Sequence, residues 1–184
     1  MNYGLLIGGV ILTICLVYYL ITYNIFIKMN NRVKEAFSTM DVYLKKRWDL
    51  IPNIVETVKG YAKHEKDTLK EIVEKRNESY DNLSETEKIK TNKQINSDIS
   101  RLMAIAENYP DLKANKNFLS LQKELRNVED EIAQSRKYYN AVVRDYNNKV
   151  EMIPSNLVAK TLGYKTKEMF IAEESSRESV KVEL

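Results

Sequence analysis

The chain has 184 residues, of which 43% are hydrophobic and 30% are charged, a balance typical of a folded protein. Its 5 glycines and 3 prolines are too few for the frequent turns of a β-sandwich or barrel, so long helices are favoured. The 29 basic and 26 acidic residues leave a formal charge of +3, which does not indicate a nucleic-acid-binding protein.

The N-terminal segment has the composition of a transmembrane helix. Residues 5–23 read LLIGGVILTICLVYYLITY, and the first charged side chain is Lys28. About 20 apolar residues, at ~1.5 Å each, span a hydrocarbon core of ~30 Å. A cleaved signal peptide is disfavoured because no basic leader precedes the run, and a lipoprotein signal because Ile14 precedes Cys15. A buried core helix is usually shorter. We therefore expect residues 1–28 to form a single membrane anchor.

The charges that flank this segment predict its orientation. No Lys or Arg precedes the span, whereas Lys28, Arg32 and Lys34 follow it. Because Lys and Arg gather on the cytoplasmic side, we expect the short N-terminus outside the cell membrane and a helical domain, residues 29–170, in the cytoplasm. The polar tail, residues 171–184, is expected to be disordered.

The first part of the domain has the pattern of one long helix. Apolar residues between Val33 and Ile72 recur every three or four positions, as on one helix face. Pro52 interrupts this pattern: either the helix kinks there, or Asp49 caps a second helix with Pro52 in its first turn. We favour a kinked, nearly continuous helix and place the first turn of the chain at residues 77–84.

The next helix has clear start and stop signals. Ser84 and Glu87 have the spacing of a capping box, with Ser84 as the N-cap and Glu87 at N3. Pro110 disfavours a helical residue before it, so this helix ends by Tyr109.

The strongest periodicity belongs to a third long helix, which ends at residues 152–154. A short helix over residues 156–162 should follow, with Gly163 as its C′ residue. The steps of three and four predict coiled-coil-like packing. The fold class is therefore all-α: one N-terminal transmembrane helix followed by an elongated antiparallel helical bundle. The periodic residues are Phe118, Leu121, Leu125, Val128, Ile132, Ser135, Tyr139, Val142 and Tyr146.

The predicted helix lengths do not match. At ~1.5 Å per residue the helix before Pro110 covers only about half of the first one. The far end of the third helix, with Tyr139, Val142 and Tyr146, then lacks a partner unless the C-terminal segment or another subunit covers it. Because an exposed apolar patch usually marks an interface, we expect a homo-oligomer.

Signatures of enzyme chemistry are mostly absent from the sequence. His64 is the single histidine, so no second His completes a zincin-like pair, and the single cysteine, Cys15, lies inside the apolar N-terminal run. No Gly-rich phosphate loop or nucleophile elbow is present. Glu124, Glu129 and residues 130–131 fit a solvated helix face better than a catalytic pair. We expect no enzymatic activity, no cofactor and no metal.

Polar residues on or beside the core stripe are candidates for a site. Arg47 lies seven residues after Met40 and seven before Ile54, and two Tyr-Asn pairs also lie seven apart. These residues form either a structural polar layer that fixes the bundle register, or a site for a ligand or partner. The candidate set is Arg47, Asp49, Asn53, Arg136, Tyr139, Asn140, Tyr146 and Asn147.

Two segments of the chain resemble the LemA family of bacterial membrane proteins. Residues 41–65, DVYLKKRWDLIPNIVETVKGYAKHE, resemble one family signature, and residues 107–121, ENYPDLKANKNFLSL, resemble a second. The Tyr-Asn pairs are similar to further family positions, so the resemblance runs from the anchor to about Phe170. Trp48 stands where the family pattern has His, which argues against a metal or catalytic role there. The resemblance implies an outside N-terminus and a cytoplasmic bundle, and it supplies no catalytic residue.

Three hypotheses for function follow. The first is a membrane-anchored, non-enzymatic structural or scaffold protein whose bundle self-associates or organises partners at the membrane. The alternative is an adaptor or regulator of a membrane enzyme, such as a protease or transporter, without self-assembly. A hydrolase ranks last and would need a cleft with a perturbed carboxylate near His64. The expected partners are the lipid bilayer, further copies of the chain and other membrane proteins, but not nucleic acid.

Overall fold

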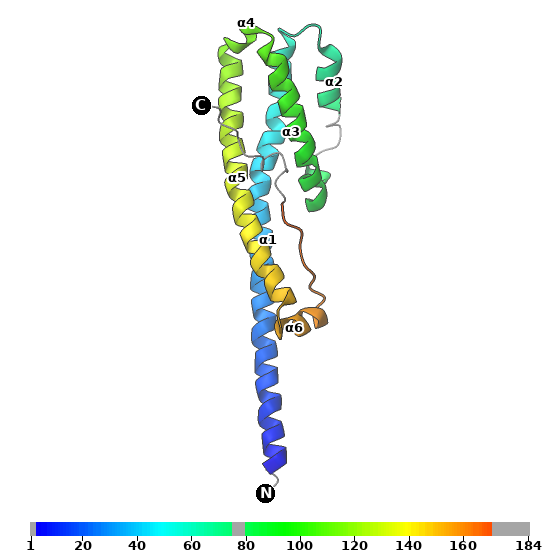
Figure 1. Ribbon diagram of the computed structural model, residues 1–184, viewed down its shortest axis with the longest axis vertical. Coiled ribbons are helices and arrows are strands. Elements are labelled where there is room, and N and C mark those ends of the chain that lie inside the picture. Colours follow the sequence, from blue (N-terminus) through cyan, green and yellow to red (C-terminus); the bar gives the residue numbers. More distant parts are fainter. Residues whose placement is uncertain (1–2, 75–79, 171–184) are drawn as a thin grey trace, which may run out of the picture. The chain divides into compact units, whose positions relative to one another are not determined.

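The structure is a computed structural model that describes residues 3–74 and 80–170, and the regular elements of this part are all helices, as predicted. The predicted tail, residues 171–184, lies outside the described residues, as does part of the predicted turn at 77–84. The elements are α1 (Tyr3–Lys59), α2 (Lys66–Glu74), the 3₁₀-helix η1 (Tyr80–Asn82), α3 (Glu85–Glu107), α4 (Pro110–Lys113), α5 (Lys116–Glu151) and α6 (Ser155–Thr161) (Figure 1).

Contacts divide the chain into two compact units. Unit 1 comprises residues 1–37 and 136–184, and unit 2 comprises residues 38–135, so that α1 and α5 each contribute to both. The domain limits expected from the sequence, at residues 28 and 170, divide the chain differently and stay a prediction.

The first long helix is continuous through Pro52, as expected, but it ends earlier than expected. α1 stops at Lys59, and the turn that follows leads into α2, whose Leu69 and Ile72 are buried. The expectation of one helix up to the turn at 77–84 is therefore wrong. Because Leu69 and Ile72 keep the three–four spacing after the turn, the periodicity alone did not reveal the break.

Unit 2 is a helical bundle built around α1, α2, α3 and α5. Asp41 of α1 bonds Lys88 of α3 and Arg47 bonds Asn92, so α1 and α3 run in the same direction. The short α2 supplies the return between them, and α5 runs back along both. Apolar residues of these helices, of α4 (Pro110–Lys113) and of the turn after α1 share one core, made by Ile51, Ile54, Val55, Val58, Ala62, Leu69, Ile72, Ile95, Leu102, Ala106, Leu112, Phe118 and Leu125.

The predicted capping box at the start of α3 is confirmed. The backbone N–H of Glu87 donates to Ser84 Oγ at 3.3 Å, and the backbone N–H of Ser84 donates to Glu87 Oε2 at 2.8 Å. These reciprocal bonds satisfy two backbone donors that a helix start leaves without partners. Hydrogen bonds from the Ser84 hydroxyl and backbone lower the pKa of Glu87. α3 ends at Glu107, before Pro110, also as predicted.

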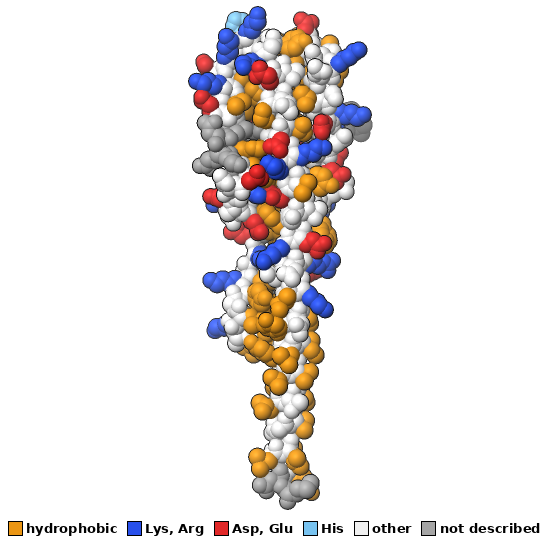
Figure 2. Space-filling view, turned by 180° about the vertical axis from the view of Figure 1, so that it is seen from behind, with side chains coloured by type: hydrophobic (Ala, Val, Ile, Leu, Met, Phe, Trp, Pro, Cys, Tyr) orange, Lys and Arg blue, Asp and Glu red, His pale blue; other side chains and the backbone are white. Residues whose placement is uncertain are grey.

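The N-terminal part of α1 in unit 1 is apolar and exposed. α1 is long and apolar enough to cross a membrane, and none of its most apolar stretch is buried. Figure 2 shows hydrophobic side chains along this part of the helix and charged side chains of both signs elsewhere on the same face. Burial begins at Thr22 and Phe26, which are 1% and 0% exposed.

Unit 1 closes through α6 and an extended segment. Gly163 has a φ of 71°, which a residue with a side chain rarely adopts, and its N–H donates to the Lys160 carbonyl at 3.3 Å. The N–H of Tyr164 donates to the Ala159 carbonyl at 2.9 Å, which completes a Schellman motif. The predicted short helix with Gly163 at C′ is confirmed, and residues 164–170 then continue without helix.

The aromatic end of α5 is covered by the chain itself, contrary to the expectation of an exposed patch. Tyr139 and Tyr146 are 4% and 1% exposed. Tyr146 packs edge-on against Phe26 and Tyr164, and these two rings stack with centroids 5.2 Å apart. The chain reverses direction in α2, so α3 runs parallel to α1 and α5 runs antiparallel to both. The C-terminal end of α5 therefore lies beside the earlier part of α1. The exposed-patch argument for a homo-oligomer is therefore wrong. The predicted stripe is buried along α5 except for half-buried Leu121, and its coiled-coil geometry stays a prediction.

Candidate functional site: a surface cavity and two polar networks

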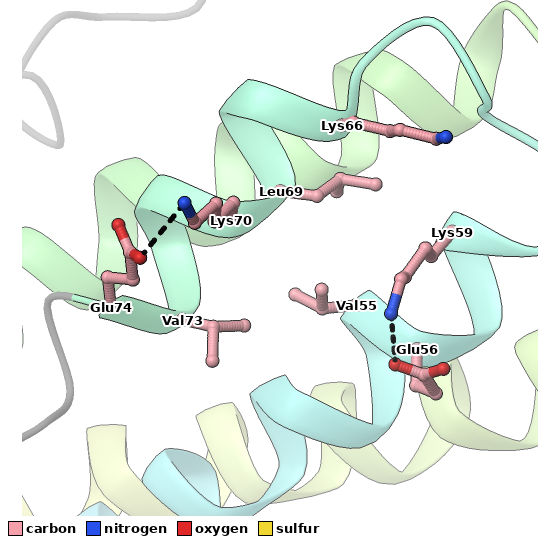
Figure 3. Close-up of a pocket in the computed structure, with 8 residues that line it drawn as sticks. All are labelled: Val55, Glu56, Lys59, Lys66, Leu69, Lys70, Val73 and Glu74. Carbon is pink, nitrogen blue, oxygen red and sulfur yellow. Dashed lines mark hydrogen bonds and ion pairs between the residues drawn. The ribbon is translucent and has the colours of Figure 1, made fainter.

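A cavity of about 360 Å³ lies between α1 and α2 in unit 2 (Figure 3). Its apolar lining comes from Val55, Leu69 and Val73. Charged residues at its edge are paired along their own helices, with Lys59 Nζ 3.3 Å from Glu56 Oε2 and Lys70 Nζ 3.4 Å from Glu74 Oε1. An aliphatic lining with a charged edge suits an apolar side chain of a partner better than a reaction. His64, where the hydrolase hypothesis needed a cleft, is exposed and does not line this cavity.

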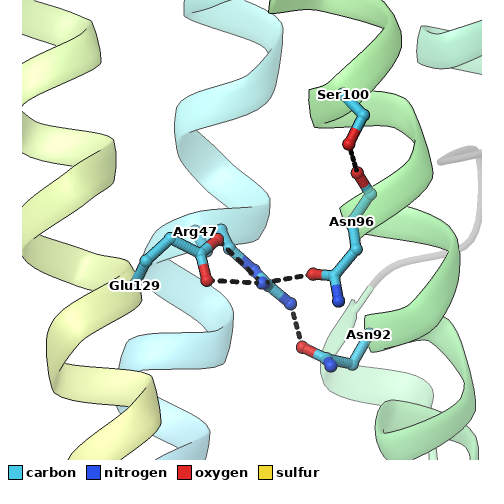
Figure 4. Close-up of polar contacts among 5 residues, drawn as sticks. All are labelled: Arg47, Asn92, Asn96, Ser100 and Glu129. Carbon is cyan, nitrogen blue, oxygen red and sulfur yellow. Dashed lines mark hydrogen bonds and ion pairs between the residues drawn. The ribbon is translucent and has the colours of Figure 1, made fainter. Parts of the chain in front are cut away.

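The first polar network centres on Arg47 of α1, which is 1% exposed (Figure 4). Its Nη1 donates to Glu129 Oε1 at 2.8 Å and to Asn96 Oδ1 at 2.9 Å, and its Nη2 donates to Asn92 Oδ1. α3 presents Asn92 and Asn96 on one face because they lie four residues apart, and Glu129 comes from α5. The guanidinium therefore joins three helices at one level of the bundle.

This arrangement supports a structural reading of Arg47. A buried charge is tolerated only when it is paired and hydrogen-bonded, and Asn92, Asn96 and Glu129 pair Arg47 within this chain. Its Nε is buried without a hydrogen-bond partner among the described residues. This unpaired donor lowers the free energy of unfolding, whereas the hydrogen bonds of the two Nη atoms raise it. Such a layer fixes which residues face each other more than it adds stability.

A neighbouring cluster was not found by sequence reasoning. The hydroxyl of Tyr80 in η1 donates to Asp41 Oδ1 at 2.6 Å, and Lys88 Nζ lies 2.7 Å from Asp41 Oδ2. Lys88 Nζ also lies 4.7 Å from the centroid of the Tyr80 ring. Burial, together with the hydrogen bond to Asp41, raises the pKa of Tyr80. These contacts attach η1 to α1 and α3. Since η1 has no periodic pattern, only the position of Lys88 seven residues before Ile95 hinted at them.

The second network, in unit 1, explains the two Tyr-Asn pairs. The side-chain amide of Asn147 donates to the Lys167 carbonyl at 2.9 Å and accepts from the Lys167 N–H at 2.8 Å. Asn140 repeats this with the carbonyl and N–H of Phe170, at 2.9 and 2.7 Å. Both asparagines thus hold the main chain of the extended segment 164–170, and we call this arrangement the asparagine clamp.

The spacing of the asparagine clamp follows from helix and extended-chain geometry. Seven residues of an α-helix rise ~10.5 Å, while three residues of extended chain cover ~10 Å. Asn140 and Asn147 are seven apart on α5, and their partners Phe170 and Lys167 are three apart. The two distances match, so each asparagine faces the N–H and the C=O of a single residue of the segment.

Three further candidates gather around the same segment. The Tyr139 hydroxyl donates to the Glu168 carbonyl at 3.1 Å, and the Arg136 guanidinium lies 5.7 Å from the centroid of the Phe170 ring. Tyr146 lies in the aromatic cluster with Tyr164, and burial raises the pKa of its hydroxyl. Five of the eight candidates therefore act on residues 164–170, which belong to the C-terminal segment that the sequence left open as a cover for this end of the helix.

Asp49 and Asn53 lie apart from both networks. The side chain of Asp49 is 59% exposed and lies 3.7 Å from Lys45 Nζ, and Asn53 is also exposed. At ~100° per residue, Asp49 points ~200° away from Arg47 around α1. The candidate set is thus divided among three places: Arg47 in the core of unit 2, five residues at the segment 164–170, and two residues on the surface.

The described residues form an all-helical protein. Its first helix, α1, is long and apolar enough to cross a membrane. Comparison with known families identifies its family: the chain belongs to the LemA family, whose sequence model matches residues 36–184. It is 30% identical over 173 residues to Protein LemA of Metamycoplasma hominis, covering 92% of this chain and 79% of that protein.

The chain is also similar to magnetosome proteins. It is 25% identical over 177 residues to Magnetosome protein MamQ 2 of Paramagnetospirillum magneticum, covering 82% of this chain and 65% of that protein. It is 24% identical over 177 residues to Magnetosome protein MamQ of Magnetospirillum gryphiswaldense, with the same coverage. None of these names is that of an enzyme.

Replacing Arg47 by Leu should destabilise the protein. The substitution leaves the buried Asn92, which is 4% exposed, without its donor, and an unpaired buried polar group costs about 1–3 kcal/mol. Denaturant unfolding of the detergent-solubilised full chain, followed by circular dichroism, measures the change. Asp49→Leu on the same helix is the control and should stay within about 0.5 kcal/mol. Unchanged stability of Arg47→Leu would contradict the structural reading.

Replacing either clamp asparagine by Ala should release the segment 164–170. Each variant loses two hydrogen bonds worth about 0.5–1.5 kcal/mol each, so local opening should rise on the order of tenfold. Limited trypsin digestion at Lys165 and Lys167, analysed by mass spectrometry, reports this opening. Asn148→Ala is the matched control, because Asn148 is the exposed neighbour of Asn147. Equal cleavage of all variants would show that the clamp does not hold the segment.

Proposed function

We propose that this protein is a membrane-anchored, non-enzymatic scaffold that organises partners at the cytoplasmic face of the cell membrane. The apolar part of α1 crosses the bilayer once, with the short N-terminus outside. The charges after the span, beginning at Lys28, support this orientation because no Lys or Arg precedes it.

The continuity of α1 carries the proposal. One helix of 57 residues contains both the exposed apolar stretch and the residues Ile51, Ile54 and Val58 of the bundle core. A helix satisfies its own backbone hydrogen bonds, so it can pass from lipid into water without a break. The tether is therefore part of the folded domain rather than a linker attached to it.

The polar groups of the protein support a binding role over a catalytic one. Arg47 and the clamp asparagines are occupied by the chain's own helices and main chain. What remains available to partners is the surface, where charges of both signs intermix, and the cavity between α1 and α2 (Figures 2 and 3). An apolar side chain from a partner would fill this cavity, and the charges at its edge would supply orientation.

Self-association is one form that scaffolding could take. The aromatic end of α5 is covered and gives no support for self-association. The remaining support is confinement to a membrane plane, which raises the effective concentration of weak contacts between copies of the chain. The alternative, an adaptor of a membrane enzyme that does not self-assemble, is favoured by the cavity. The mass of the detergent-solubilised full chain separates the two: a uniform multiple of the subunit mass supports self-association, and a monomer supports the adaptor.

The anchor is tested by placing arginines in the apolar stretch. Arg at the centre of a transmembrane helix costs about 2.5–3.5 kcal/mol, so Leu12→Arg with Leu16→Arg should lower the fraction retained in alkaline-washed membranes. Val42→Arg is the control, since Val42 is 64% exposed in unit 2. Protease added outside intact cells should spare residues beyond Lys28 of the unsubstituted protein. Retention of the double variant, or digestion of the bundle from outside, would contradict the anchor or its orientation.

A further inference from the structure

The corner between α5 and α6 presents apolar side chains to the outside of unit 1. Met152, Ile153 and Leu157 are 62%, 82% and 64% exposed. Met152 and Ile153 lie in the turn before α6 and Leu157 lies on α6, whose Val158 and Ala159 are 5% and 1% exposed. The buried face of α6 fixes this helix in place, so the exposed apolar side chains of the corner are held in a defined position.

This corner lies beside the membrane-proximal part of α1. The hydroxyl of Thr161 in α6 lies 3.4 Å from that of Tyr19, and Tyr164 stacks on Phe26. Figure 1 shows α6 alongside α1, and the N-terminal part of α1 continues beyond α6 without a neighbouring helix among the described residues. Tyr19 belongs to the expected span, residues 5–23, at the end where tyrosines gather. Because tyrosine is enriched at the boundary between lipid and water, a bilayer around the proposed span would place α6 at the depth of that boundary.

Between Glu151 and Glu168, the charged side chains of the corner are all positive. Residues 152–167 contain Lys160, Lys165 and Lys167 and no Asp or Glu. Lys160 and Lys165 are exposed. Apolar side chains beside lysines are the composition of segments that lie in a membrane interface, with the apolar groups at the acyl boundary and the lysines near anionic headgroups.

We propose that the α5–α6 corner is a second membrane contact: Met152, Ile153 and Leu157 insert into the interfacial layer of the leaflet from which α1 emerges. This inference rests on the proposed membrane anchor. The anchor holds the corner against the lipid surface, so a contact too weak to bind a membrane alone is occupied continuously. A lipid surface fits better than a second copy of the chain, because lysines on both copies would face each other.

Depth-dependent fluorescence quenching tests the proposal. Single cysteines at Ile153, at Leu12 in the anchor and at Val42 in unit 2 are made in a Cys15→Ala background and labelled with an environment-sensitive fluorophore. All three positions are exposed, at 82%, 73% and 64%, so labelling disturbs no core. The full chain is reconstituted into phosphatidylcholine–phosphatidylglycerol vesicles that carry a quencher either near the headgroups or deep in the acyl chains.

The proposal expects a blue-shifted emission at position 153 that the shallow quencher reduces more than the deep one, the reverse order at position 12, and neither effect at position 42. Quenching at position 12 without quenching at 153 would overturn the second contact and leave the anchor intact. A blue shift at 153 without lipid quenching would also overturn it, since protein would then cover the corner. No quenching at position 12 would overturn the anchor, and with it the proposal.

Discussion

The structure depends on α1 remaining a single helix from an exposed apolar stretch to the core of a bundle. From Tyr3 to Ile21 its side chains are exposed except for half-buried Tyr18, whereas from Val33 onward one face is buried at every three or four residues. Other helices pack on the buried face of α1. In unit 1 these are α5 and α6, and in unit 2 they are α2, α3 and α5. Pro52 lies on the exposed side of this helix, so its ring does not interrupt the buried face.

The two polar networks act on register rather than on overall stability. Apolar stripes at heptad spacing can slide past one another by a turn with little loss of contact. Arg47 meets Asn92, Asn96 and Glu129 only in one register, since any shift would leave a buried guanidinium unpaired. The asparagine clamp does the same for the segment 164–170. Because its bonds go to the main chain, it does not depend on the side chains that follow α6.

Local signals in the sequence were sufficient for much of the fold. The anchor-like stretch, the capping box at Ser84, the stripe along α5 and the Gly163 terminus all follow from spacing and residue type. The end of α1 was missed, although Gly60 follows its last residue. Glycine at that position is a common termination signal, but Leu69 and Ile72 resume the pattern in phase.

The candidate site was only partly predictable, because its partners are distant in the sequence. The position of Arg47 between Met40 and Ile54 was enough to select it, and Asn92, three residues before Ile95, could have been selected in the same way. Glu129 was assigned to a solvated face, and it is indeed half-exposed while pairing with Arg47. The partners of Asn140 and Asn147 lie 30 and 20 residues away in a segment without helical period, which leaves no local signal.

Amide hydrogen exchange on the full chain reconstituted in lipid vesicles tests the continuity of α1 most directly. Exchange in a helix requires that its hydrogen bonds open, so a linker between anchor and bundle would exchange fast. The account predicts slow exchange without interruption from Asn24 through Leu44. A fast-exchanging stretch within these residues would show that the anchor and the bundle are separate elements, and would contradict the account.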